Sequence, residues 1–246
     1  MGRSKNRKMV FKQFTVLDDR CAMKIGTDAV VLGVVANHAN PAKILDIGTG
    51  SGIVALMLAQ RFPGASVTAI EIEPNAYSQA CENINSSPFE ISCVHESFQD
   101  YSQRDDLKFD LIVTNPPFFD GTSKSPFEAR NMARHDDYLK LNEIFSRAEK
   151  LLKKEGKLVV VWPVEREDEL NEKLSESSLE LIEVCEILPT VHHNPVRLIA
   201  SFMHEKQSED AATTRTQIIL ENGEGDNRKF TPEYMSLMTD FFLADG

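Results

Sequence analysis

Residues 43–52 read KILDIGTGSG, and this stretch decides the fold. Its apolar first half predicts a buried strand, Lys43–Gly48, and the helical pattern after it predicts a helix, Ser51–Phe62, that buries Ile53 and Leu56. The glycines between the two elements allow the backbone to adopt positive φ and to approach a ligand closely. The stretch therefore predicts a strand, a glycine-rich loop and a helix, the first unit of an α/β fold.

Strand and helix patterns alternate along most of the remaining chain. Further strands are predicted at Ser66–Ile72, Ile91–Val94, Phe109–Thr114, Lys157–Trp162, Leu179–Leu188 and Val196–Met203, and further helices at Pro74–Asn85, Tyr138–Lys154 and Glu165–Ser175. This alternation predicts βαβ units around a doubly wound, mostly parallel sheet. Ligands bind such sheets at the carboxyl ends of the strands, where residues 48 and 115 lie.

Two parts of the chain lie outside this alternation. Residues 1–40 form an N-terminal extension, and residues 41–246 are predicted to form one domain, without a linker. The remaining predicted elements are an extended stretch at Val10–Leu17, a helix at Asp28–Ala39, an exposed loop or short hairpin within 207–227, and a short helix at Pro232–Leu243.

Composition narrows the class of protein. The 246 residues carry a formal net charge of −11, and no apolar stretch approaches the roughly 18 residues of a membrane span. The basic N-terminus has no apolar segment behind it, and the four cysteines lack CxxC spacing. We therefore expect a cytoplasmic protein with reduced thiols, no disulfide framework and no metal site.

The charge distribution predicts a basic face beside an acidic one. Basic residues gather in the first residues and again after residue 118, namely Arg3, Lys5, Arg7, Lys8, Arg130, Arg134 and His135. They are candidates for contact with a phosphate backbone. The alternative is a solvated acidic surface with a disordered basic tail.

Two acids sharpen the interpretation of the glycine loop. Asp46 precedes the first glycine by two positions, and Glu71 closes the second strand, where a carboxylate can hold two ribose hydroxyls. Ile53 stands where the dinucleotide fingerprint has Gly or Ala. An acid in the loop disfavours a pyrophosphate and favours a ligand with an amino group and a sulfonium, which is S-adenosylmethionine. An NAD-type nucleotide and a purely structural loop are the alternatives.

A second motif, Asn115-Pro116-Pro117-Phe118, follows the strand Phe109–Thr114. The Asn115 amide oxygen and the Pro116 carbonyl can both accept hydrogen bonds from one planar NH2 group, and Pro-Pro restricts the backbone between them. Phe118 offers an aromatic face for a flat heterocycle. The alternative is an ordinary turn after a strand, since Asn-Pro and Pro-Pro are common turn sequences.

These motifs, in this order, resemble the Rossmann-type S-adenosylmethionine-dependent methyltransferases, and the NPPF form resembles those that act on amino groups. Further segments resemble the bacterial tRNA1(Val) (adenine-37 N6)-methyltransferases over nearly the whole chain. These segments are Phe11–Phe14, Asp19–Asp28, Leu32-Gly33, Ala133–His135 and Asp240–Leu243. The resemblance implies a three-layer fold with a seven-stranded sheet whose last strand is antiparallel. It also implies methyl transfer to adenine 37 of a tRNA, yielding S-adenosylhomocysteine without a metal. We expect the protein to be a monomer.

The resemblance also implies roles for individual residues. Residues 1–40 would cap the cofactor site, and the RNA contacts would come from the basic residues named above. The cofactor residues would be Lys24, Thr27, Asp28, Asp46, Gly48, Thr49, Gly50, Glu71, Ser97, Phe98 and Asn115, and the catalytic residues Asn115, Pro116, Pro117 and Phe118. Thr27 or Asp28 could simply cap the following helix, and both roles can hold at once. Ser97 stands where an acid usually meets the cofactor adenine and is a weaker acceptor, and Phe98 could be a core residue.

Three other functions fit parts of the sequence. Another NPPF-type enzyme would methylate guanine N2 in ribosomal RNA or glutamine N5 in a protein. A catalytically silent relative would bind RNA without reaction. An NAD-dependent dehydrogenase would need a loop without Asp46 and would leave Asn115–Phe118 unexplained. No histidine is expected to act in catalysis.

Overall fold

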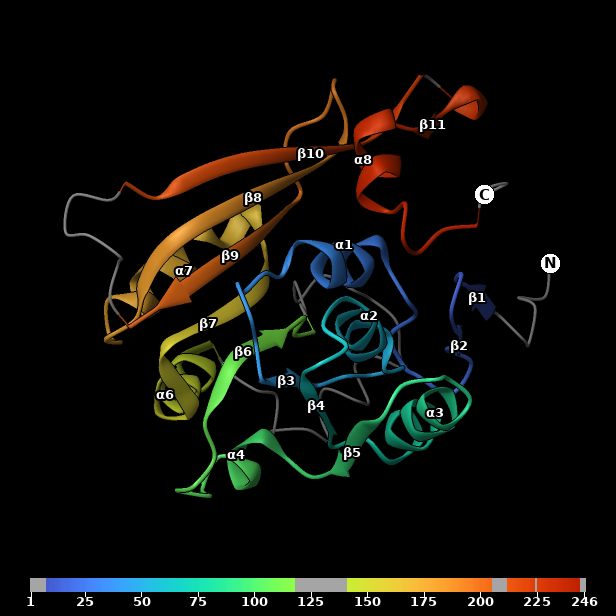
Figure 1. The fold of residues 1–246 in the computed structure, drawn as a ribbon. Coiled ribbons are helices and arrows are strands. Elements are labelled where there is room, and N and C mark those ends of the chain that lie inside the picture. Colours follow the sequence, from blue (N-terminus) through green and yellow to red (C-terminus); the bar gives the residue numbers. More distant parts are fainter. Residues whose placement is uncertain (1–7, 118–140, 205–211, 224, 244–246) are drawn as a thin grey trace, which may run out of the picture.

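The structure, a computed structural model, describes residues 8–117, 141–204, 212–223 and 225–243. Nine strands of these residues form the main sheet, in the order β11-β10-β8-β9-β7-β6-β3-β4-β5 (Figure 1). Their bounds are β3 Lys43–Ile47, β4 Ser66–Glu71, β5 Ile91–His95, β6 Phe109–Thr114, β7 Leu152–Pro163, β8 Glu180–Thr190, β9 Arg197–Met203, β10 Thr214–Asn222 and β11 Lys229–Phe230.

Helices cover both faces of the sheet. They are α1 Thr27–Val35, α2 Ile53–Arg61, α3 Pro74–Asn85, α4 Phe98–Tyr101, α6 Leu141–Leu151, α7 Glu167–Leu174 and α8 Pro232–Leu237, with 3-10 turns η1 Val164–Arg166 and η2 Gly225–Asn227. Consecutive strand residues point to opposite faces, so Ile44 packs in the core under α1 and α2, whereas Leu45 packs in the core under α6. The predicted three-layer arrangement is confirmed.

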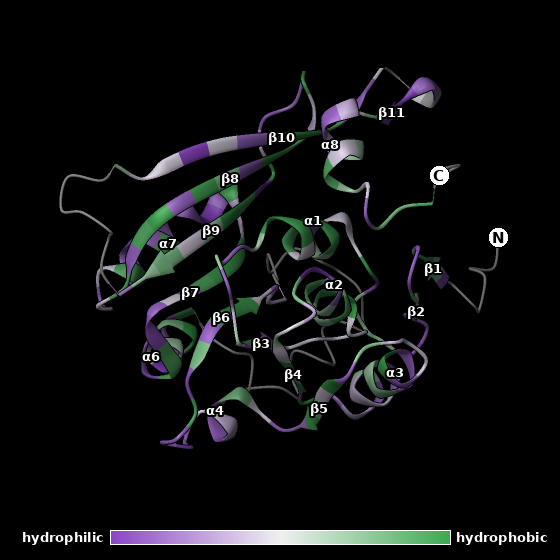
Figure 2. Cartoon of the chain, viewed as in Figure 1, coloured by the Kyte–Doolittle hydropathy of each residue, from purple (hydrophilic) through white to green (hydrophobic). Residues whose placement is uncertain are grey.

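The predicted seven-stranded sheet is also confirmed, with two strands added. β3 to β7 pair in parallel, and β9 lies antiparallel between β7 and β8. Nine residues of the segment predicted as a loop or hairpin, Thr214–Asn222, are instead strand β10, which runs parallel to β8, and only Glu221 and Asn222 pair with β11. An edge strand exposes its outer side, so its polar first residues, Thr214–Gln217, are compatible with strand structure. Figure 2 shows mainly hydrophobic colour on β7 and mixed colour on β10.

Several predicted boundaries were wrong, among them the end of α8, which is Leu237 rather than Leu243. Helix α6 ends at Leu151 rather than Lys154, and β7 begins at once, at Leu152 rather than Lys157. The pairing then jumps, because Phe109 faces Leu152 but Leu111 faces Lys157. Gly156 suits this bulge, since a Cβ there would lie 2.8 Å from the Phe109 carbonyl oxygen.

The helix after the N-terminal segment is shorter than predicted and is capped differently. Helix α1 ends at Val35, and its N-cap is Gly26, without a side-chain cap hydrogen bond. The alternative in which Thr27 or Asp28 caps this helix is therefore wrong. No helix in the described part of the chain is long and apolar enough to cross a membrane.

The two ends of the described chain lie together (Figure 1). Strands β1 (Lys8–Val10) and β2 (Thr15–Leu17) form a small hairpin, so the stretch predicted as extended over Val10–Leu17 is instead the end of one strand, a turn and a second strand. The rings of Phe11 and Phe14 stack at 4.7 Å, and Phe11 also lies 6.2 Å from Phe242. The buried Asn83 on α3 accepts from Leu17 N at 3.0 Å and donates to Leu17 O and Ser51 O at 2.8 Å. Asn83 thus joins the N-terminal segment to the glycine-rich loop.

Candidate cofactor and acceptor site

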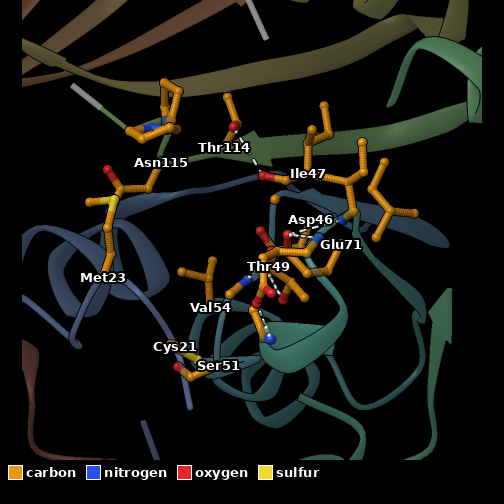
Figure 3. A pocket seen from close by; sticks show the side chains of 18 of the residues that line it. Cys21, Met23, Asp46, Ile47, Thr49, Ser51, Val54, Glu71, Thr114 and Asn115 are labelled. Atoms are coloured by element: carbon orange, nitrogen blue, oxygen red, sulfur yellow. Dashed lines mark hydrogen bonds between the residues drawn. The ribbon is translucent and has the colours of Figure 1, made fainter. Parts of the chain in front are cut away.

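A cavity of about 290 Å³ lies at the carboxyl ends of β3, β4 and β6 (Figure 3). The loops that follow these strands form its walls, together with the loop after β5 and part of the N-terminal segment. Its lining includes Cys21–Gly26, Asp46–Ser51, Glu71–Glu73, Glu96–Gln99 and Thr114–Pro117. The structure therefore brings both sequence motifs and the N-terminal segment to one site.

The glycines of the loop are required by its backbone. Gly48, Gly50 and Gly52 have φ values of +66°, +58° and +84°, which residues with a Cβ rarely adopt. A Cβ built on Gly48 or Gly50 would meet no protein atom within 4 Å. The loop therefore leaves space beside its backbone, as close binding of a ligand requires.

Asp46 lies at the bottom of this loop and is 2% exposed. Its Oδ2 accepts hydrogen bonds from Thr49 Oγ1 at 2.6 Å and from Ala55 N at 3.2 Å. Burial raises the pKa of Asp46 to about 7, and the nearby Glu71 carboxylate adds to the rise. A buried carboxylate of this kind would be stabilised as an anion by a cationic ligand group and would repel a pyrophosphate.

Glu71 is held in place by three backbone N–H groups. Its Oε2 accepts from Gly50 N, and its Oε1 accepts from Ile72 N and Glu73 N, each at 2.9 Å. Burial raises the pKa of Glu71, and these hydrogen bonds oppose the rise. A carboxylate has about four acceptor positions, so this one is fixed and still retains acceptor capacity.

The acceptor motif is joined directly to the cofactor loop. Thr114 Oγ1 donates to Ile47 O at 3.0 Å, which holds the ends of β6 and β3 together. Asn115, Pro116 and Pro117 follow and line the cavity, and Figure 3 shows Asn115 across it from Asp46 and Glu71. Phe118 lies outside the described residues, so its stacking role stays a prediction.

The three predicted cofactor residues of the N-terminal segment lie differently. Lys24 lines the cavity, and its Nζ donates to the carbonyl oxygens of Asp18, Asp19 and Cys21 at 2.5, 3.2 and 2.9 Å. Thr27 and Asp28 do not line the cavity. Asp28 Oδ2 instead accepts from Arg197 Nε on β9 at 3.0 Å. Cofactor contacts by these residues remain predictions.

Ser97 and Phe98 both line the cavity but have structural roles as well. Ser97 Oγ accepts from Asp100 N at 3.0 Å and donates to Asp100 Oδ2 at 2.7 Å, so this hydroxyl caps α4. Phe98 is 4% exposed and belongs to the core that α6 covers. It is a core residue that also forms part of the cavity wall.

Several lining residues were not predicted from the sequence. Two are apolar and unusually exposed, Met23 at 54% and Ile72 at 47%. Others are Cys21, whose pKa burial raises to about 12, and the polar Glu96 and Gln99. Met23, Ile72 and Glu96 directly adjoin the predicted residues Lys24, Glu71 and Ser97, and this adjacency could have identified them.

Most predicted RNA contacts cannot be placed. Lys8 is exposed at the start of β1. The other six, Arg3, Lys5, Arg7, Arg130, Arg134 and His135, lie outside the described residues. Among the residues that the structure describes, no three His, Cys, Asp or Glu side chains are grouped as metal ligands would be.

Known proteins match this chain over most of its length. The methyltransferase small domain family matches residues 21–186. A tRNA1(Val) (adenine(37)-N6)-methyltransferase of Bacteroides fragilis is 39% identical, over 95% of this chain and 96% of its own, and one of Christiangramia forsetii is 37% identical, over 97% and 98%. Their lengths are thus matched almost completely.

Solved structures support the fold. A predicted O-methyltransferase from Agrobacterium tumefaciens superposes with a TM-score of 0.64 at 18% identity, covering 87% of this chain and 96% of its own. TYW2 of M. jannaschii, solved in complex with AdoMet, gives 0.54 at 16% identity, covering 82% and 88%. These structural matches show the fold, and the relatives above, 37–39% identical over almost the whole chain, show that the chain belongs to the tRNA1(Val) (adenine(37)-N6)-methyltransferase family.

Proposed function

We propose that this protein methylates the exocyclic N6 amine of adenine 37 in tRNA1(Val), with S-adenosylmethionine as the donor and S-adenosylhomocysteine as the product. The relatives named for this reaction match almost the whole chain, the N-terminal segment included. One observation carries the chemistry: Asn115, Pro116 and Pro117 line the same cavity as Asp46, the glycine loop and Glu71. A methyl donor and an amine acceptor would therefore meet in one site.

The residues present fit this cofactor. Asp46 would favour its amino group, the open backbone at Gly48 and Gly50 would allow close approach, and Glu71 would accept from ribose hydroxyls. When bound, the cofactor supplies a methyl group on a sulfonium. The exposed side chains of Met23 and Ile72 give the cavity an apolar rim.

The acceptor motif would make the amine reactive. The nitrogen lone pair of adenine is delocalised into the ring, so the amine is a poor nucleophile. Hydrogen bonds from its two N–H groups to Asn115 Oδ1 and the Pro116 carbonyl would favour a pyramidal nitrogen and return electron density to it. Positioning supplies the rest of the rate enhancement, and the product nitrogen loses its proton late, without a dedicated histidine base.

The RNA side of the proposal follows from the same chemistry. The target base must leave its stack to enter the cavity, which costs less in an anticodon loop than in a duplex. Stacking on Phe118 would contribute about 1–3 kcal/mol. The basic residues of the N-terminus and of the segment after Phe118 would bind the phosphate backbone of the tRNA. We place the reaction in the cytoplasm and expect the protein to act as a monomer.

The Asn115→Ala variant tests this function. Asn115 lies at the acceptor end of the cavity, so the variant should bind S-adenosylhomocysteine with nearly unchanged affinity and lose most of its methylation of tRNA1(Val). Asn40→Ala is the matched control, because Asn40 is exposed and does not line the cavity. If Asn115→Ala methylated tRNA1(Val) at the same rate as the protein without the substitution, the mechanism would be contradicted.

A further inference from the structure

Met23 is an exposed apolar side chain in the cavity wall, and the proposed mechanism gives it no individual contact. It is 54% exposed, whereas its neighbours Cys21 and Ile25 are 5% and 7% exposed. Among the residues that the structure describes, Ile72 is the other exposed large hydrophobic side chain in this wall. Ile72 directly follows Glu71 and so belongs to the ribose end of the cavity. Met23 is left as an apolar surface without an assigned ligand.

The backbone around Met23 is held from within the N-terminal segment. Lys24 Nζ donates to three carbonyl oxygens of the preceding turn, those of Asp18, Asp19 and Cys21, at 2.5, 3.2 and 2.9 Å. The next residue, Ile25, donates from its backbone N to the buried Asp18 Oδ2 at 2.9 Å. Residues 18–25 therefore close on themselves, and this closed loop carries the exposed Met23 side chain.

Contacts on both sides attach this loop to the rest of the domain. Before Met23, Arg20 donates from its N and Nε to the buried Gln79 Oε1 on α3, at 3.4 and 3.1 Å. After Met23, Asp28 Oδ2 accepts from Arg197 Nε on β9 at 3.0 Å. A side chain on a loop that is fixed at both ends can present a defined surface to a ligand.

The Met23 side chain extends towards the acceptor motif. Figure 3 shows it reaching from its loop towards Asn115, which lies across the cavity from Asp46 and Glu71. Met23 and Asn115 both line the cavity. Asp46 and Glu71 are the residues proposed to bind the amino group and the ribose of the cofactor. Met23 therefore borders the space that is left for the methyl acceptor.

A flat base in that space would present two faces and one polar edge. Asn115 and the Pro116 carbonyl would bind the amine at the edge, and Phe118 is predicted to stack on one face. A thioether suits the second face, because Met is unbranched, adapts its shape and makes favourable contacts with aromatic rings. It carries no strong donor or acceptor that would compete with Asn115 for the amine.

We propose that Met23 contacts one face of the target adenine and, with Phe118 on the other face, holds the amine at Asn115. The inference rests on the proposed function, because it takes the methyl acceptor to be a base that enters this cavity. The resemblance gave the adjacent Lys24 a role at the cofactor and gave Met23 none. Loss of a contact to the acceptor alone should lower kcat/KM for tRNA and leave the cofactor affinity unchanged.

Met23→Ala, compared with Met23→Leu, tests this contact. Met23→Ala should lower kcat/KM for methylation of tRNA1(Val) about five- to tenfold, as expected for the loss of one thioether contact with a ring. Its affinity for S-adenosylhomocysteine, measured by calorimetry, should change by less than about twofold. Met23→Leu restores an apolar surface of similar size and should recover most of the lost kcat/KM.

A tRNA1(Val) with an abasic ribose at position 37 locates the contact. With S-adenosylhomocysteine present, Met23→Ala should bind the tRNA that carries adenine 37 about five- to tenfold more weakly than the unmodified protein does. The two proteins should bind the abasic tRNA equally well. Equal weakening for both tRNAs would overturn the inference, because it would place Met23 against the tRNA backbone or give it a purely structural role.

Val191→Ala is the matched control, because Val191 is 62% exposed and does not line the cavity. This variant should match the unmodified protein in each assay. The inference is also overturned if Met23→Ala, shown to be folded by thermal melting, keeps the full kcat/KM, or if its affinity for S-adenosylhomocysteine falls as strongly as its kcat/KM. Failure of the unmodified protein to methylate tRNA1(Val) would instead contradict the proposed function itself.

Discussion

Replacing Asp46 by asparagine should remove a proton that the protein releases when it binds its cofactor. The Asp46 carboxyl is buried, and its pKa is raised to about 7. A ligand ammonium beside it would favour the ionised form and lower that pKa. At pH 6 the carboxyl is mostly protonated before binding and ionised afterwards. Asparagine keeps the shape of the side chain but cannot ionise.

The size of the effect follows from the pKa. With a pKa near 7, about 0.9 of the Asp46 side chains carry a proton at pH 6 and about 0.1 at pH 8. Binding at pH 6 should therefore release close to one proton, and binding at pH 8 almost none from this group. By linkage, the affinity should weaken about tenfold from pH 8 to pH 6.

Calorimetry with S-adenosylhomocysteine in buffers of different ionisation enthalpy measures the released protons. The ligand amino group stays protonated at pH 6, so it does not contribute there. Asp46→Asn should bind more weakly, release no proton at pH 6 and show little dependence on pH. Comparison of the two proteins separates Asp46 from Glu71, whose pKa is also raised. Binding by the unmodified protein at pH 6 without proton release would refute the reasoning.

Three further predictions concern stability. Gly33→Ala should lower the free energy of unfolding, measured by urea titration, by about 1–3 kcal/mol, because a Cβ at this position would lie 2.6 Å from Met57 Sδ and 2.9 Å from Met57 Cβ. Gly64→Ala is the control, since a Cβ there would meet nothing within 4 Å. Equal losses of stability in the two variants would contradict this packing. Asn83→Ala should increase hydrogen exchange at the Leu17 amide and lower the free energy of unfolding by about 1–3 kcal/mol, because it leaves the backbone groups of Leu17 and Ser51 without their Asn83 partner. Unchanged exchange at Leu17 would contradict the role of Asn83 in joining the N-terminal segment to the loop. Because the folded pKa of Asp46 lies above its ordinary 3.8, its ionisation should reduce stability as pH rises from about 4 to about 7, and Asp46→Asn should flatten that part of the curve. If the free energy of unfolding of the unsubstituted protein instead rose with pH over this range, in parallel with that of Asp46→Asn, the predicted sign of the pH dependence would be contradicted.

Much of the site was predictable because its chemistry is local in sequence. The glycines at 48, 50 and 52 need positive φ within one short loop, and Asp46 and Glu71 stand at the ends of easily recognised strands. Parallel pairing of β3 with β6 then brings the segment after Thr114 beside that loop. Strand periodicity, together with the rule that ligands bind at the carboxyl ends of parallel strands, was sufficient to predict this part of the site.

The remainder depends on contacts between distant residues. Asp28 pairs with Arg197, 169 positions away, so local spacing could predict a helix cap but not this partner. The orientation of Gln99 depends on Glu143, 44 positions away on another helix. Strand β10 escaped prediction because its exposed first residues have the polar composition of a loop. Burial and pairing with β8 determine its structure, and neither is visible in the segment itself.

Transfer of a methyl group to the adenine amine is the central claim, and mass spectrometry of the substrate tests it most directly. Purified protein would be incubated with S-adenosylmethionine and tRNA1(Val) from cells that lack the gene, and the tRNA would be digested to oligonucleotides and nucleosides. We predict one added methyl group, at N6 of adenine 37, and almost none with Asn115→Ala. An unmethylated adenine 37 with the unmodified protein, or a methyl group on guanine instead, would contradict the account.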